Sequence, residues 1–196
     1  MRNKIYLAFI LLPATQTLAL TWTESVNGDL SDNASAPTNI TFDVGVNTIS
    51  GRMGDDEPGV SLPSNPPLDR DIFTFTLAPQ QFLTSINVRT FEPRSRSFYA
   101  IASGSSISLD NGSLHMGNML LSATGEILPT LSSPGEFGAL GFPTPLGAGT
   151  YTIWFQEAGN LVNYSFDYTV AVPEPQSLTV IAAGALALRR TRKLRA

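Results

Sequence analysis

The side chains most capable of chemistry are five acidic residues at the two ends of one loop rich in glycine and proline. Asp55, Asp56 and Glu57 lie near its start, and Asp69 and Asp71 lie at its end. Ca²⁺ prefers hard oxygen ligands of this kind, so these five are the candidate calcium ligands. Two alternatives stay open, because acids in such loops are ordinary solvated turn residues and paired carboxylates also serve glycosidases.

The chain has a single histidine, His115, and no cysteine. A serine hydrolase needs a histidine between an activated serine and an orienting acid, yet no Gly-x-Ser-x-Gly motif accompanies His115. Catalytic zinc sites take several histidine or cysteine ligands. The sequence therefore predicts a protein that is not an enzyme, with a secreted hydrolase as the alternative.

Aromatic residues offer a third kind of site. Trp22, Tyr99 and Trp154 could stack on sugar rings, although scattered aromatic side chains are also ordinary core residues. A carbohydrate-binding module therefore stands beside a calcium-binding module as an alternative function.

The segments that must position these residues have the pattern of short strands. In "DIFTFTLAPQQ" (71–81) two phenylalanines alternate with threonines, and "FLTSINVRTF" (82–91) places Phe82, Ile86 and Val88 on one side. This period of two is typical of half-buried strands. "GTYTIWFQE" and "NYSFDYTV" alternate in the same way, and "AGNLVN" between them is typical of a hairpin turn.

Shorter candidate strands are "NITFDV", "VNTISG", "SFYAIA" and "MLLSA". Sixteen glycines and fourteen prolines among 196 residues favour frequent turns over long helices. Together these features predict an all-β domain over residues 20–172, an antiparallel β-sandwich of the jelly-roll type. Within it five arginines oppose fifteen acids, so we expect no binding to nucleic acid.

The first residues have the pattern of a secretory signal peptide. Arg2 and Lys4 precede eight apolar residues, and small residues follow at the spacing that signal peptidase requires. The apolar run is too short to span a bilayer. We expect residues 1–19 to be a signal peptide cleaved after Ala19.

The last residues, 173–196, form a tail with three parts in a fixed order. Pro173, Glu174 and Pro175 come first, and an uncharged apolar stretch (176–188) follows. The tail ends in a basic cluster of Arg189, Arg190, Arg192, Lys193 and Arg195. As a helix the apolar stretch would be about 20 Å long, short for a bilayer core, which predicts a transient membrane helix with its basic end in the cytoplasm.

This tail resembles the PEP-CTERM sorting signal of exported bacterial proteins. The resemblance implies that exosortase, a membrane-embedded protease or transpeptidase, cleaves near the Pro-Glu-Pro motif after export. It also implies that the protein uses the export machinery, is held transiently at the inner membrane, and then reaches the cell surface or extracellular matrix. Extracellular polysaccharide is the further partner that the family implies.

The body is similar to the bacterial pre-peptidase C-terminal domain. The likeness rests on "NTISG" (47–51), on Asp69 and Asp71 before the Phe73–Phe75 pair, and on "GTYTI" (149–153). Those domains are small β-sandwiches that act as accessories of secreted proteins. The expected function is therefore that of an exported, non-enzymatic protein of the cell envelope or matrix, without a resident cofactor unless calcium binds.

Overall fold

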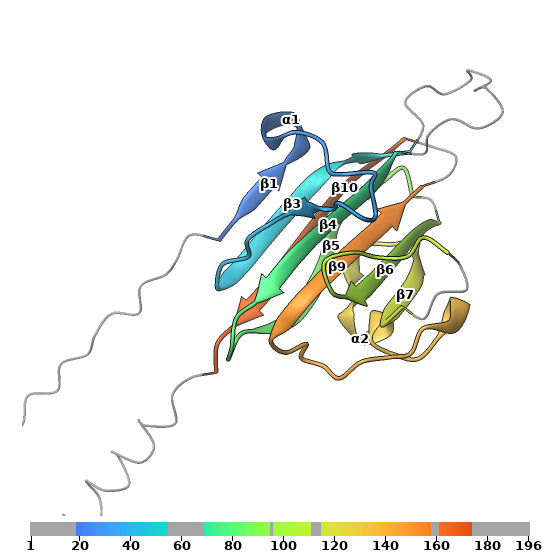
Figure 1. Cartoon of the computed structure of the whole chain (residues 1–196). Coiled ribbons are helices and arrows are strands. Elements are labelled where there is room, and N and C mark those ends of the chain that lie inside the picture. The colour runs from blue at the N-terminus through green and yellow to red at the C-terminus, as the bar shows by residue number, and fades with distance from the viewer. Residues whose placement is uncertain (1–18, 55–68, 95, 111–114, 158–160, 174–196) are drawn as a thin grey trace, which may run out of the picture.

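Two five-stranded β-sheets pack face to face in the computed structural model (Figure 1). The structure describes residues 19–54, 69–94, 96–110, 115–157 and 161–173. In spatial order sheet A contains β1 (Thr21–Thr23), β3 (Gly45–Met53), β10 (Val162–Ala171), β5 (Phe82–Glu92) and β8 (Gly125–Glu126). Sheet B contains β2 (Thr38–Asn39), β4 (Arg70–Leu77), β9 (Gly149–Gln156), β6 (Ser97–Ser103) and β7 (Gly117–Leu121).

Helical structure in the described residues is short. The helix α1 (Glu24–Asn27) follows β1 directly, α2 (Leu128–Leu131) follows β8, and a 3₁₀ turn, η1, spans Glu136–Gly138. The predicted β-rich fold is confirmed. No described helix is long and apolar enough to cross a membrane, and the predicted membrane segment, 176–188, lies outside the described residues.

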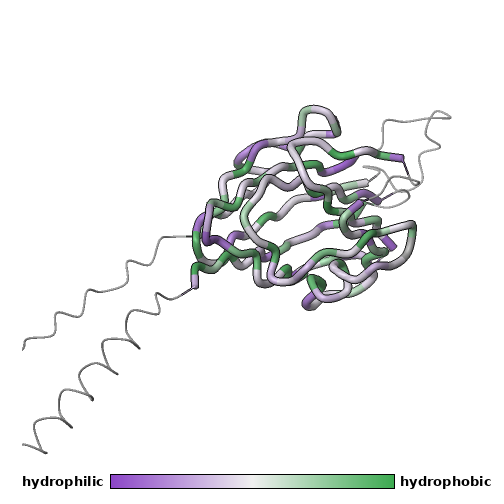
Figure 2. Tube along the Cα trace, turned by 60° about the horizontal axis from the view of Figure 1, so that its bottom comes forward, coloured by the Kyte–Doolittle hydropathy of each residue, from purple (hydrophilic) through white to green (hydrophobic). Residues whose placement is uncertain are grey.

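The core lies between the sheets and is built from inward-facing aromatic residues. Phe42 stacks on Phe75 with ring centroids 4.5 Å apart, and Phe73 meets Tyr168 edge-on at 5.7 Å. Tyr99 of sheet B and Tyr168 of sheet A join their hydroxyl groups at 2.9 Å across the core. Hydrophobic and hydrophilic residues alternate along the strands in Figure 2, as the period of two predicts.

The sheets are mixed, so the prediction of a wholly antiparallel sandwich is wrong at two edges. β1 runs parallel to β3, and β2 runs parallel to β4, whereas the remaining pairs are antiparallel. The predicted hairpin between the last two strands is also wrong. β9 belongs to sheet B and β10 to sheet A, so their connection crosses from one sheet to the other.

Because of two bulges in β5, Phe82 does not share the face of Ile86 and Val88, contrary to the prediction from the sequence pattern. Along the pairing of β5 with β10 the register skips Thr84 and Arg89, and each extra residue reverses which face the next side chain takes. Leu83 is therefore fully buried, while Phe82 is only partly buried. Of the shorter predicted strands, "NITFDV" (39–44) contributes only Asn39, the last residue of β2, and 40–44 lie in no strand.

The two ends of the described body lie at one end of the sandwich. Ala19 lies beside Gly45, where a Cβ on that glycine would be 3.8 Å from the Cβ of Ala19. Gly45 in turn pairs with Val170, close to the end of β10. The helix α1 lies at the opposite end of the sheets (Figure 1), which separates the acidic cluster described next from both ends.

Candidate functional site

An acidic cluster at the α1 end of the sandwich is the strongest candidate site. One carboxyl oxygen from each of Glu24, Asp29 and Asp71 lies within 4.8 Å of the other two. Glu24 begins α1, Asp29 lies in the loop after it, and Asp71 is the second residue of β4. The cluster therefore joins the segment that follows the edge strand of sheet A to a strand of sheet B.

Asp71 points into the space between the sheets because it shares the strand face of Phe73 and Phe75. Its side chain is fully buried. Neither carboxyl oxygen has a hydrogen-bond partner among the described residues, although Glu24 and Tyr164 lie near enough to affect its pKa. Burial first, and then the negative charge of Glu24, raises the pKa of Asp71 from 3.8 to about 10. A carboxylate in this position requires a proton or a cation to balance its charge.

Glu24 reaches this space through the position of Gly51 in β3. A Cβ on Gly51 would lie 2.0 Å from Oε2 of Glu24, so only glycine leaves room for the carboxyl group. Oε2 accepts a hydrogen bond from the backbone N–H of Arg52 at 2.7 Å. Oε1 accepts one from the hydroxyl of Tyr164, also at 2.7 Å. Both oxygens are thereby held in place.

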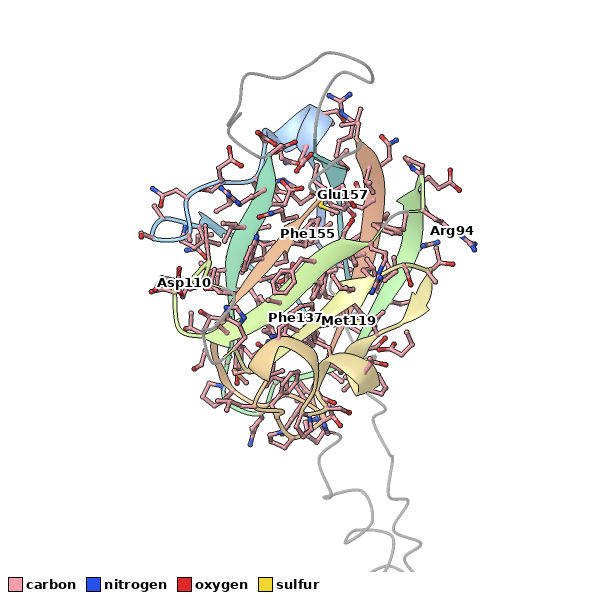
Figure 3. The ribbon with its side chains drawn as sticks, turned by 90° about the vertical axis from the view of Figure 1, so that its right-hand side faces the viewer. Arg94, Asp110, Met119, Phe137, Phe155 and Glu157 are labelled. Atoms are coloured by element: carbon pink, nitrogen blue, oxygen red, sulfur yellow. The ribbon has the colours of Figure 1, made fainter. Side chains whose placement is uncertain are left out.

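Tyr164 completes the inner wall of the cluster. Its ring is buried and meets Phe155 of β9, labelled in Figure 3, edge-on at 4.5 Å. Burial, together with the charges of Asp71 and Glu24, raises the pKa of Tyr164 well above 10. The phenol therefore stays protonated and acts as a hydrogen-bond donor.

A cleft of about 470 Å³ opens onto the cluster from outside. Its described lining consists of Glu24, Ser25, Asp29, Arg52 and Asp69. Arg52, which is exposed, is the basic residue in this described lining, and the other charged residues are acidic. Such an arrangement can accept a small cation with its water ligands and would repel anions.

The structure describes two of the five predicted calcium ligands, Asp69 and Asp71. Asp71 belongs to the cluster, and Asp69 lines the adjoining cleft. Asp55, Asp56 and Glu57 lie outside the described residues. Sequence reasoning missed Glu24 and Asp29, which are far from Asp71 along the chain. The available signal was Gly51, an inward position in an alternating strand that lacks a side chain.

His115 has the surroundings of a structural residue. It is buried, and its Nε2 lies 2.8 Å from the carbonyl oxygen of Ser108. Its ring packs against Phe98 and Trp154, with centroid distances of 6.3 and 6.0 Å. Among the described residues these contacts do not place His115 between a serine hydroxyl and a carboxyl group, which is the arrangement of a catalytic triad.

The three aromatic residues considered for sugar stacking do not form an exposed strip. Tyr99 is fully buried in the core, and Trp154 is buried on the outer face of sheet B. Trp22 is partly buried against the core. These positions leave no common face on which the three rings could stack against a sugar.

A second, smaller cleft lies beside β7, far from α1. It has a volume of about 260 Å³ and is lined in part by Asn118, Met119 and Ser133; Met119 is labelled in Figure 3. The buried Asn118 amide has no protein partner within the described residues. The cleft has room for ordered water, which usually serves such groups.

Of the processing residues, Ala19 and Pro173 are described and bound the sandwich. Pro173 is exposed directly after β10. Glu174, Pro175 and the basic residues of the tail lie outside the described residues. Searches against models of known protein families and against curated proteins found no match to this chain.

Proposed function

We propose that this chain is an exported, non-enzymatic β-sandwich protein of the cell envelope or extracellular matrix. A signal peptide directs its export, and exosortase cleaves it at the Pro-Glu-Pro motif. The observation that carries the proposal is the three-part tail beginning at Pro173. Exposure of Val172 and Pro173 just beyond the last strand supports it, because a membrane-bound protease needs an accessible, extended segment.

The arrangement of the body also supports this proposal. Ala19 and Pro173 both lie at the end of the sandwich opposite the acidic cluster. From Gly45 to Gly51 a strand covers about 20 Å, so a protein held at the membrane by its tail would present the cluster away from the membrane. The described strands of both sheets lie between Thr21 and Ala171, so we expect the body to remain folded after both cleavages.

We also infer that the connectivity is that of a jelly roll. Without the parallel edge strands β1 and β2, the sheets have the orders β3-β10-β5-β8 and β4-β9-β6-β7. Strands that are consecutive in the chain alternate between the sheets except at β6 and β7. This pattern of eight strands supports two interlocked Greek keys.

Intact-mass measurement on the protein from its native host tests the sorting proposal. We expect loss of residues 1–19 and of the segment after roughly residue 175, because both signals are removed during export. In a host without exosortase the tail should remain. A variant with Pro173, Glu174 and Pro175 replaced by alanine should also retain its tail, whereas Val172→Ala should be processed normally.

A tail that survives in the normal host would contradict the proposal. The apolar stretch would then act as a permanent anchor or as part of a soluble tail. Retention of residues 1–19 in the exported protein would contradict the signal-peptide assignment separately.

A further inference from the structure

We propose that Glu24, Asp29 and Asp71 bind a Ca²⁺ ion that ties the β1–α1 segment to strand β4. This site does not depend on the proposed sorting function. Two of its three residues, Glu24 and Asp29, lie outside the loop that the sequence pattern indicated. The proposal is carried by the spacing of the carboxyl groups, by the buried state of Asp71 and by the way in which Glu24 is held.

The spacing of the three carboxyl groups matches a calcium coordination shell. Ca²⁺ binds oxygen ligands at about 2.3–2.6 Å, so two ligands on opposite sides of the ion are about 4.8 Å apart. The three oxygen atoms already lie within 4.8 Å of one another. The ion could therefore enter without a shift of the backbone, and the cleft of about 470 Å³ leaves room for water ligands.

Asp71 is the observation that distinguishes this cluster from an ordinary group of surface acids. Its carboxyl group is fully buried, faces the other two acids, and has no hydrogen-bond partner among the described residues. Buried carboxyl groups are ordinarily paired or bound to a metal. A cation at the cluster would supply the missing partner directly.

Glu24 is oriented for a ligand from two sides. The backbone N–H of Arg52 and the hydroxyl of Tyr164 each bond one of its oxygens, which leaves further lone pairs on both oxygens for an ion. Such supporting hydrogen bonds are typical of metal ligands. The absence of a side chain at Gly51 creates the space in which this carboxyl group sits.

The positive charge of Arg52 does not take the place of a bound cation at the three carboxyl groups. Its side chain is exposed and lines the outer cleft, where solvent screens its charge. Asp69 adds another negative charge to the same cleft. The inner three carboxyl groups therefore need a small ion that can approach them together, which a guanidinium group at the mouth of the cleft cannot do.

Terbium luminescence of the full chain in detergent is the direct test. Tb³⁺ binds calcium sites, and Tyr164 beside Glu24 can sensitise its emission when tyrosine is excited. We expect emission that Ca²⁺ displaces at about 10⁻⁴–10⁻³ M, the range of extracellular calcium modules. Mg²⁺ should displace Tb³⁺ only at much higher concentration, because it demands shorter, octahedral coordination.

Three variants assign the ion to the cluster. Glu24→Gln and Asp29→Asn should each weaken Ca²⁺ competition by at least about tenfold, since ligand charge sets calcium affinity. Gly51→Ala should have the same effect, because the new methyl group would displace the Glu24 carboxyl group. Asp43→Asn is the matched control, because Asp43 is an exposed acid at the other end of β3 and should bind as the wild type does.

The same preparation should melt at a higher temperature with Ca²⁺ than with chelator, and the variants should lose this shift. Hydrogen exchange at the amides of β1 and α1 should slow when Ca²⁺ is added, because the ion ties this segment to β4.

Three results would overturn the proposal. The first is the absence of any emission that Ca²⁺ displaces from the folded wild type. The second is unchanged affinity in both Glu24→Gln and Asp29→Asn, with loss instead in a combined Asp55→Asn, Asp56→Asn, Glu57→Gln variant. The third is equal displacement by Mg²⁺ and Ca²⁺, which would remove the assignment to calcium.

Discussion

Asp71 shows how strand periodicity can place a charged residue where a hydrophobic one is expected. Its position in β4 is one of the inward ones, in step with Phe73 and Phe75, yet it carries a carboxyl group. A buried polar group without a partner lowers stability by roughly 1–3 kcal/mol, and more when it is charged. Because a buried, unpartnered carboxyl group lowers the stability of the fold, Asp71 is better explained by a function than by core packing.

We predict that Asp71→Asn stabilises the protein when a chelator is present, by about 1–3 kcal/mol. The amide has nearly the same shape and is neutral in both states, so it removes the cost of protonating a buried carboxyl group that the unfolded chain leaves ionised. Urea unfolding with chelator, and again with Ca²⁺, measures both effects. In Ca²⁺ the gain should vanish, because the variant loses a ligand that the wild type retains.

The exposed Asp43→Asn is the control and should change stability by less than about 0.5 kcal/mol. A variant Asp71→Asn that is clearly less stable than the wild type in chelator would show that the carboxyl group is already paired in the folded protein.

At the level of elements, sheet B has a third layer that the strand pattern does not reveal. Ile72, Ala100, Ile107 and Trp154 form a second apolar cluster on its outer face. The backbone N–H of Ile107 bonds the carbonyl of Ala34 at 3.2 Å, which holds the covering segments together. β4 and β9 are therefore covered on both faces.

We predict that Ile107→Ala lowers the free energy of unfolding by about 2–4 kcal/mol, the usual range for a buried isoleucine that leaves a cavity. Ile107 is 6% exposed. Leu140→Ala is the matched control, because Leu140 is 58% exposed and its truncation should have little effect. Equal effects of the two variants on urea unfolding would mean that the outer layer contributes little.

The bulges of β5 are a second feature at this level. The extra residues Thr84 and Arg89 each shift the following side chains of β5 to the opposite face of the sheet. Arg89 then reaches Asp167 of β10 at 3.1 Å on the surface, and Thr84 donates a hydrogen bond to the Thr169 carbonyl at 3.2 Å. Thus each bulge is tied to the neighbouring strand by a side chain.

At the level of the whole molecule, apolar packing joins the two sheets, and a hydrogen bond between two tyrosine hydroxyl groups lies within this apolar core. The hydroxyl groups of Tyr99 and Tyr168 meet at 2.9 Å, and both side chains are fully buried. Burial raises the pKa of each tyrosine well above 10. The folded protein therefore keeps both protons at a pH at which the unfolded chain releases them.

We predict that this pair makes the protein sensitive to alkali. The pair's contribution to the free energy of unfolding is complete below the unfolded pKa of about 10. As the pH rises above that value, each tyrosine lowers the free energy of unfolding by about 1.4 kcal/mol per pH unit. Urea unfolding of the wild type and of the double variant Tyr99→Phe/Tyr168→Phe should therefore diverge above a pH of about 10.

The single variant Tyr168→Phe should cost about 1–2 kcal/mol at neutral pH, because the Tyr99 hydroxyl then lacks its partner. The double variant should cost less than the sum of both single variants. Parallel pH profiles of wild type and double variant would contradict a buried, protonated pair.

The sequence by itself determined the β-rich class and most strand positions, because alternation of apolar and polar residues directly reflects a pleated, half-buried backbone. It correctly placed strands at "VNTISG", "SFYAIA" and "NYSFDYTV". It also singled out Asp71, through its place before an alternating segment. The signal peptide and the sorting tail stay predictions, since their motifs lie largely outside the described residues.

Tertiary structure decided what local patterns cannot encode. Alternation is the same in a hairpin and in a crossover, so the placement of β9 and β10 in different sheets depends on long-range packing. The parallel pairing of β1 with β3 likewise brings Glu24 over Gly51. Glu24, Asp29 and Asp71 are separated by up to 47 positions in the chain, and only the stacking of the two sheets brings their carboxyl groups together.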